Sequence, residues 1–421
     1  MKVLVIGSGE KEHAIVWKLS QSRNINRIFC SPGNTEIAEI AECVDVSPNN
    51  FRALIDFVKY EWIDLTVVGP EELFSKGIVD EFEKEGCKIL GPNRRAAQLT
   101  SSRVFAKNLM RLHRIPTAEF KVFTSYLHAK DYVRLKGTPI VIKADTPFEE
   151  PGEFVVSTLE EAMDALKLVI EDRIGVDTSK RVIIEDNLKG ERVSFIILTD
   201  GKTIVPFTGL HKYKQLFSGN TVPKTTVMGA SSPAPIITKK LEDIIMEKIM
   251  RPIIKALNSE NIIYKGVLSA DLVIDKDNPY VFDFKCCFCD PETQTVLPRI
   301  KTDFIDLAQA IIEERLSEIK IEWKQGASVC VVISSKDYPN KYQKGAIIKG
   351  LEKIKLMNDT VVFHAGTSFL DKDIIASGGR VISIIATGTE IKDASNKAYN
   401  ALEKISFDGM YYRKDIGNNK F

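Results

Sequence analysis

The sequence has no apolar run that could cross a membrane, because no stretch approaches the ~20 consecutive apolar residues that a bilayer requires. Its opening, MKVLVIGSGEKEHA, places glycines and charges directly after a short apolar run. That arrangement is typical of a first β-strand and not of a secretion signal. We therefore expect a cytoplasmic protein without membrane partners.

The chain also has almost no net charge, since 58 basic residues oppose 57 acidic ones and the formal charge is +1. A balanced chain has no global attraction to nucleic acid or to acidic membranes. The hydrophobic and charged fractions, 44% and 27%, are ordinary for a globular protein. We expect small-molecule partners, no nucleic acid, and a monomer or small homo-oligomer.

Cysteine is sparse and does not form the spaced pairs of a structural zinc site. Four of the seven cysteines are isolated in apolar surroundings, as is usual for buried free thiols in a reducing compartment: Cys30, Cys43, Cys87 and Cys330. The stretch KCCFC, with Cys286, Cys287 and Cys289, is the exception. Three close thiols could hold a soft metal, but a fourth ligand is missing from the pattern, and their role is left open.

Strand and helix patterns alternate through the first hundred residues, which predicts a doubly wound parallel sheet with ligands at the carboxyl ends of its strands. Four turns fall at those ends: 7–9 (GSG), 32–34 (PGN), 69–71 (GPE) and 91–92 (GP). The first is only a partial dinucleotide fingerprint, because Glu12 stands where a third glycine would fall. We do not expect NAD.

The rest of the chain predicts two further parts. Residues 102–325 combine a small α/β unit at about 121–189, long strand pairs, and an amphipathic helix over 239–260. Residues 326–421 contain short strands with glycine turns and a closing helix, which indicate a β-rich cap. With an N-terminal domain over 1–101, the expected class is α/β with central α+β subdomains.

Several sequence blocks occur in one order along the whole chain: VLVIGSGEKEHAIVWKLSQS, SPGN, DLTVVGPE, ILGP, IPTAEF, PIVIKAD, MGASSPAP, DPETQTVLPR and FHAGT. Together they resemble the phosphoribosylamine–glycine ligase family, ATP-grasp enzymes of purine synthesis. The resemblance implies ATP and magnesium as cofactors and an ATP-grasp centre. It also implies a reaction in which the carboxylate of glycine attacks the γ-phosphate, and phosphoribosylamine then attacks the resulting glycyl phosphate.

The resemblance also implies roles for particular residues, although it assigns no catalytic residue. Contacts to ATP are expected from four side chains: Arg103, Lys143, Glu185 and Glu191. The phosphoribosylamine and glycine sites are expected to include Gly9, Asn34, Glu71, Lys214 and Asp290. Asp283 is the expected magnesium ligand.

The chain departs from the family pattern at several places, of which three change the charge expected at the ATP, metal and glycine sites. Where the family has K-A-D-G-L-A-A-G-K-G, residues 143–153 read KADTPFEEPGE, so prolines remove amide donors and glutamates add negative charge. Where the family has E-F-N-C-R, residues 283–287 read DFKCC, so Lys285 replaces an amide ligand. Lys212 replaces the aspartate that would meet the glycine amine.

These departures leave three interpretations open. The chain is a ligase of the family with reduced turnover, a catalytically inactive paralogue that binds or regulates, or an ATP-grasp ligase with another acid or amine. Lys285, Lys212 and Lys224 could converge on one cleft and hold a phosphorylated ligand without metal.

Overall fold

The computed structural model describes residues 1–145, 152–170, 181–214, 227–339 and 341–418. The acidic segment 146–151 and Lys224, both singled out above, lie outside the described residues. Among the helices within these ranges, none combines the length and apolar character needed to cross a membrane. The mixed α/β architecture expected from the sequence is confirmed.

The N-terminal sheet is parallel, with strand order β3-β2-β1-β4-β5. Its strands are β1 (Lys2–Gly7), β2 (Arg27–Pro32), β3 (Glu42–Cys43), β4 (Leu65–Val68) and β5 (Ile89–Leu90). The helices α1 (Glu10–Leu19), α2 (Phe51–Glu61), α3 (Glu72–Lys76) and α4 (Ile78–Lys84) connect or cover them. Because parallel strands share direction, the turns after β1, β2 and β4 meet at one rim, as the sequence predicted.

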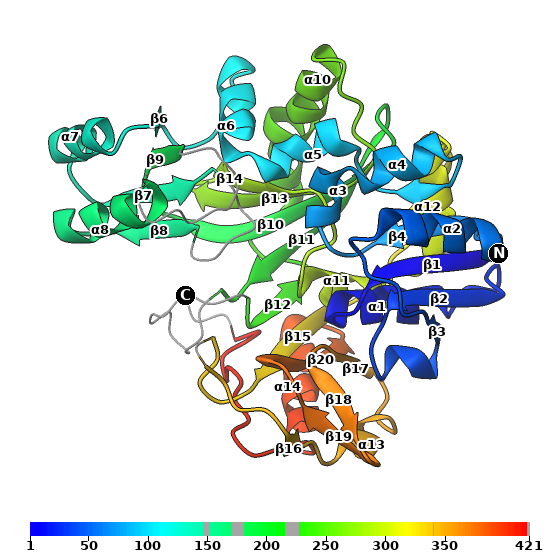
Figure 1. The fold of residues 1–421 in the computed structure, drawn as a ribbon. Coiled ribbons are helices and arrows are strands. Elements are labelled where there is room, and N and C mark those ends of the chain that lie inside the picture. The colour runs from blue at the N-terminus through cyan, green and yellow to red at the C-terminus, as the bar shows by residue number, and fades with distance from the viewer. Residues whose placement is uncertain (146–151, 171–180, 215–226, 340, 419–421) are drawn as a thin grey trace.

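A four-stranded antiparallel sheet forms the outlying unit seen at the left of Figure 1. Its order is β6 (Phe120–Phe123), β9 (Val182–Asp186), β7 (Ile140–Ala144) and β8 (Glu153–Val156). Ile140, Ile142 and Ile184 pack with apolar residues of α7 (Tyr126–Lys136) and α8 (Leu159–Ile170). Side chains alternate along a strand, so the intervening residues of β7 and β9 face the opposite side.

An eight-stranded sheet joins the middle of the chain to its C-terminal part, in the order β14-β13-β10-β11-β12-β15-β20-β17. Its strands are β10 (Glu191–Thr199), β11 (Ile204–Lys212), β12 (Gly229–Ser232), β13 (Gly266–Asp275), β14 (Asn278–Lys285), β15 (Ala327–Ser334), β17 (Thr360–His364) and β20 (Arg380–Gly388). The C-terminal part thus continues the central sheet through the β12–β15 pair. It adds a small sheet of β16 (Ala346–Ile347), β19 (Asp373–Ala376) and β18 (Thr367–Leu370), with the helices α13 (Leu351–Ile354) and α14 (Ile391–Leu402).

The amphipathic helix expected over 239–260 is present but contains a π-helical turn. It runs as α9 (Lys239–Ile245), a π segment (Met246–Met250) and α10 (Arg251–Ser259). Pro252 lies in the first turn of α10 and has no N–H to donate to the preceding turn. The remaining helices are α5 (Arg94–Ser101), α6 (Arg103–Leu112), α11 (Glu292–Val296) and α12 (Phe304–Ile312), with 3-10 turns at Ile37–Glu39, Leu297–Arg299 and Leu316–Glu318.

Candidate active site

Lys143 lies in a buried charged cluster between the four-stranded and eight-stranded sheets. Its side chain is fully buried, and its Nζ is 3.3 Å from Glu185 Oε2 and donates to the carbonyl of Phe282 at 2.9 Å. Lys107 Nζ approaches the same Glu185 oxygen at 3.0 Å. Burial, only partly offset by Glu185, lowers the pKa of Lys107 to about 8. Two ammonium groups therefore share one carboxylate.

The strand register explains why these groups meet. Lys143 pairs with Ile183 across β7 and β9, so Glu185 is its diagonal neighbour on the same face of the sheet. Lys107 comes from α6, one helical turn after Arg103. The Phe282 ring lies against this cluster, with Lys143 Nζ 3.4 Å and the Arg192 guanidinium carbon 4.1 Å from the ring centroid. Cation–π attraction orders both side chains.

Arg103 ties the small sheet to the central sheet. Its Nε donates to Asp283 Oδ2 at 3.1 Å, and its Nη1 donates to the carbonyls of Ala144 and Gly152. Burial raises the pKa of Asp283, but Arg103 and then Lys143 and Lys285 lower it further, to about 2. Asp283 is therefore a carboxylate that the protein's own cations already neutralise.

The residues around Asp283 do not fit a magnesium ion held by the protein. Magnesium prefers near-octahedral oxygen ligands, and the position two residues along β14 holds the ammonium of Lys285. Two unit charges ~4 Å apart interact by about 4 kcal/mol at an effective dielectric of ~20, so the three cations near Asp283 repel a divalent ion. Within the described ranges, no group of three or more His, Cys, Asp or Glu side chains could hold a metal ion.

A second buried ion cluster surrounds Lys212 at the end of β11. Its Nζ contacts Asp271 Oδ1 and lies 2.9 Å from Glu292 Oε1. Lys214 Nζ is 3.3 Å from Asp271 Oδ2, and Ser194 Oγ donates to Asp271 at 2.6 Å. Burial opposes ionisation of Asp271, but Lys212 and Lys214 hold its pKa well below the usual range. Lys212 thus places an ammonium group between two carboxylates.

The rim of the N-terminal sheet is organised by Gly9, Asn34 and Glu71. The Gly9 N–H donates to Glu12 Oε2 at 2.7 Å, and Asn34 Nδ2 donates to the carbonyls of Ser8 and His364. Glu71 accepts from the Cys286 N–H at 2.6 Å, and its other oxygen is 3.6 Å from Lys285 Nζ. Glu71 therefore connects the rim to β14.

Arg380, at the start of β20, is shared by two carboxylates. Its Nη2 lies 3.3 Å from Glu10 Oε1 and 2.5 Å from Asp290 Oδ1. Ser383 Oγ also donates to Glu10. Burial outweighs the attraction of Arg380, so the pKa of Glu10 rises to about 8. Residues from the start of α1, the segment between β14 and α11, and the start of β20 thus meet at one charged contact.

Replacing Glu10 by glutamine tests this raised pKa. Glu10 binds its proton more tightly when folded, so its stabilising contribution is full below pH 4.5 and is lost as pH rises through about 8. Between these values the unfolding free energy of the native chain should fall by about 1.4 kcal/mol per pH unit relative to the Glu10→Gln variant. Urea unfolding at several pH values measures the difference. Glu39→Gln, at an exposed position, is the control. If the unfolding free energies of the native chain and of Glu10→Gln changed in parallel with pH, the raised pKa of Glu10 would be contradicted.

The structure gathers most of the expected site residues into this region. Arg103, Lys143, Glu185 and Asp283 converge between the two sheets, and Lys214, Asp290 and Glu71 line the adjoining clusters. Glu191 lies apart from Lys143: its Oε1 is 3.3 Å from His211 Nδ1. The roles of all these residues in binding stay predictions.

Sequence reasoning did not single out several members of these clusters: Lys107, Asp271, Glu292, Glu10 and Arg380. Lys107 had a usable signal, because it follows Arg103 by four positions on one face of α6. Glu10 and Glu292 stand in two of the blocks that carry the family resemblance, VLVIGSGEKEHAIVWKLSQS and DPETQTVLPR. Asp271 and Arg380 gave no signal, since their partners are distant in sequence.

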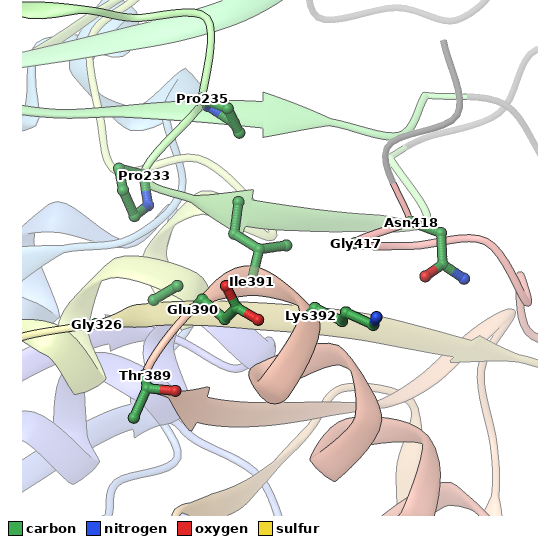
Figure 2. Close-up of a pocket in the computed structure, with 10 residues that line it drawn as sticks. Pro233, Pro235, Gly326, Thr389, Glu390, Ile391, Lys392, Gly417 and Asn418 are labelled. Carbon is green, nitrogen blue, oxygen red and sulfur yellow. The ribbon is translucent and has the colours of Figure 1, made fainter.

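A separate hollow of about 560 Å³ lies at the start of α14. Figure 2 shows Ile391, the first residue of that helix, and Glu390, which precedes it, near Pro233 and Gly326. None of the expected site residues lines it. The charged clusters, where ionisable groups from four segments converge, are therefore the stronger candidate for the active site.

Sequence comparison matches the chain to the three domain models of phosphoribosylglycinamide synthetase: the N domain over residues 1–100, the ATP-grasp (A) domain over 101–293 and the C domain over 328–419. The ATP-grasp match supports ATP and magnesium binding in general terms. The chain is 44% identical to a phosphoribosylamine–glycine ligase of Caldanaerobacter subterraneus over 416 residues, covering 99% of both chains. It is 41% identical to that of Vibrio parahaemolyticus, covering 99% and 98%.

Solved structures agree with the sequence comparison. The crystal structure of phosphoribosylamine–glycine ligase from Thermotoga maritima matches with a TM-score of 0.84 at 25% identity, covering 99% of this chain and 100% of that one. A biotin carboxylase domain from Hydrogenobacter thermophilus matches with a TM-score of 0.75 at 15% identity, covering 98% and 91%, which shows the shared fold alone. This chain belongs to the phosphoribosylglycinamide synthetase family.

Proposed function

We propose that this protein is a phosphoribosylamine–glycine ligase of purine biosynthesis, which joins glycine to 5-phosphoribosylamine with conversion of ATP to ADP and phosphate. The observation that carries the proposal is full-length similarity to ligases of that name, at 44% identity over 99% of both chains. The expected domain order, 1–101, 102–325 and 326–421, and a cytoplasmic location belong to the same proposal.

The buried charged clusters supply groups suited to this chemistry. A carboxylate that attacks a triphosphate meets like charge, so buried cations must offset the negative charge that develops. Lys143 and Arg103 lie at the junction of the two sheets and would contact the phosphates, with Glu185 fixing Lys143 in place. The rim residues Gly9, Asn34 and Glu71 would hold phosphoribosylamine.

Each step of the proposed reaction balances without a further reactant. A glycine carboxylate oxygen forms a bond to the γ-phosphorus, and the bond to the bridging oxygen breaks to release ADP. The amine of phosphoribosylamine then attacks the glycyl carbonyl and expels phosphate, and the amine loses a proton. The residues of this chain would orient the two substrates and exclude water from the acyl phosphate.

A different acid substrate is the second candidate, and Lys212 favours it. An ammonium group between Asp271 and Glu292 stands where the family has the carboxylate that would meet the glycine amine. The full-length relatives do not favour a catalytically inactive paralogue.

Release of phosphate from ATP in the presence of glycine and phosphoribosylamine tests the proposal, with alanine and hydroxyacids in place of glycine as the comparison. We expect Lys143→Met to lower kcat/KM by at least about 100-fold, because a buried phosphate-facing charge is lost. Lys189→Met, at an exposed position, should leave it unchanged. If the native chain binds ATP but releases no phosphate with any of the acids tested, the ligase assignment is refuted. Unfolding curves must show that Lys143→Met is folded.

A further inference from the structure

Asp283 and Lys285 lie on the same strand, two residues apart, so their side chains project from the same face of β14. Asp283 pairs with Asp271 of β13, and Lys285 with Ser269. The strand therefore presents a carboxylate and an ammonium group side by side on one face of the sheet. An ammonium nitrogen with three protons has no lone pair for a metal.

Lys285 lies between two carboxylates from different parts of the fold. Its Nζ is 3.6 Å from Glu71 Oε2, and Glu71 and Asp283 are the two acidic side chains with the largest attraction for it. Arg103 approaches Asp283 from the other side, with its Nε at 3.1 Å from Oδ2. The positive charge beside Glu71 and near Asp283 thus belongs to the protein.

We propose that Lys285 takes the place of a protein-bound magnesium ion, so that the charged cluster around Asp283 binds the phosphates of an adenine nucleotide with an affinity independent of divalent metal. The inference rests on the proposed nucleotide binding and adds which groups neutralise the negative charge of the phosphates. Lysine binds phosphate as a point charge and does not need the directed geometry of an octahedral ion.

The neighbouring cations support the same conclusion. Arg103, Lys143 and Lys285 all lower the pKa of Asp283, which places three positive groups within electrostatic reach of one carboxylate. Lys143 is held on the other side by Glu185 and the Phe282 ring. A diphosphate entering here meets fixed positive charge, whereas a divalent ion entering alone meets repulsion.

Calorimetric titration of the full chain with ADP, once with excess magnesium and once with EDTA, tests the inference. We expect the two dissociation constants of the native protein to agree within about threefold. Tightening by magnesium of about tenfold or more would overturn the inference while leaving the proposed ligase function in place. Absence of ADP binding in both conditions would overturn the inference and the proposed nucleotide site together.

The Lys285→Asn variant supplies an amide oxygen beside Asp283 and removes the competing charge. We expect it to bind ADP at least about tenfold more tightly with magnesium than with EDTA. Lys265→Asn is the matched control, because Lys265 is also a half-buried lysine and its Nζ pairs with Glu314, at 2.9 Å, and not with Glu71 or Asp283. The Lys265→Asn variant should bind ADP equally well with magnesium and with EDTA, as the native protein does. If magnesium tightened ADP binding equally in both asparagine variants, the inference would be overturned.

Two further measurements keep the inference testable if Lys285→Asn does not fold. Lys285→Met removes the charge without adding a ligand, so ADP binding should weaken about tenfold in both conditions and stay independent of magnesium. Unchanged affinity in that variant would overturn the inference. Paramagnetic resonance with Mn²⁺ and no nucleotide should show only free ion with the native protein, and one bound ion per chain would also overturn it.

Discussion

Replacing Lys212 by methionine is expected to lower the free energy of unfolding by about 3–5 kcal/mol, the largest single-residue effect that we predict. The substitution leaves Asp271 and Glu292 buried, with Lys214 as the remaining close cation. One oxygen of Glu292 already lacks a hydrogen-bond donor. An uncompensated carboxylate in this position cannot regain the hydration it lost on folding.

Urea unfolding monitored by circular dichroism measures this effect. Lys202→Met is the control, because Lys202 forms an exposed pair with Glu314 and its loss should change stability by less than about 1 kcal/mol. Combining Lys212→Met with Asp271→Asn and Glu292→Gln should recover most of the loss, since no buried carboxylate is then left unpaired and the Lys214 side chain is partly exposed to water. A loss below about 1 kcal/mol in the single variant would show that water reaches the cluster.

Acidification from pH 6.5 to pH 5 is expected to destabilise the protein through the buried histidine pair. His13 and His364 are both buried, and the His364 N–H donates to His13 Nδ1 at 3.0 Å. Burial, and to a smaller extent the positive charge of Lys355, lowers the pKa of His13 to about 4. Burial, and to a smaller extent His13 and Lys355, lowers the pKa of His364 to about 3. Both rings are neutral when folded and take up protons on unfolding below pH 6.5, so stability falls with pH.

The sign follows from proton binding: the unfolded state binds more protons, so acid favours it. Each histidine adds a slope of about 1.4 kcal/mol per pH unit within that window. Because Glu10 acts in the opposite direction, the comparison is between the native chain and His13→Gln, which keeps an acceptor for the His364 N–H. His13→Gln should have the shallower slope by about one proton. His128→Gln, at an exposed position on α7, should match the native slope, and a native slope in His13→Gln would contradict the prediction.

Local sequence patterns predicted the helices and strands well, because each kind of element imposes its own spacing of apolar residues along the chain. The alternating patterns of the first hundred residues gave the parallel sheet, and the turns after β1, β2 and β4 do meet at one rim. The π turn at Met246–Met250 was not predicted, since Pro252 is compatible with the first turn of a new helix as well as with a break. The continuous sheet through β12 and β15 also escaped prediction, because strand order depends on pairing between distant segments.

By itself the sequence determined the family, the order of the elements and the residue types that depart from the family pattern, because these are properties of neighbours along the chain. Only the tertiary structure decided what the substituted charges contact. Lys212 meets Asp271 and Glu292, Lys285 meets Glu71, and Arg380 is divided between Glu10 and Asp290. Coulomb energy depends on distance and burial, and both arise only when sheets distant in sequence close on one another.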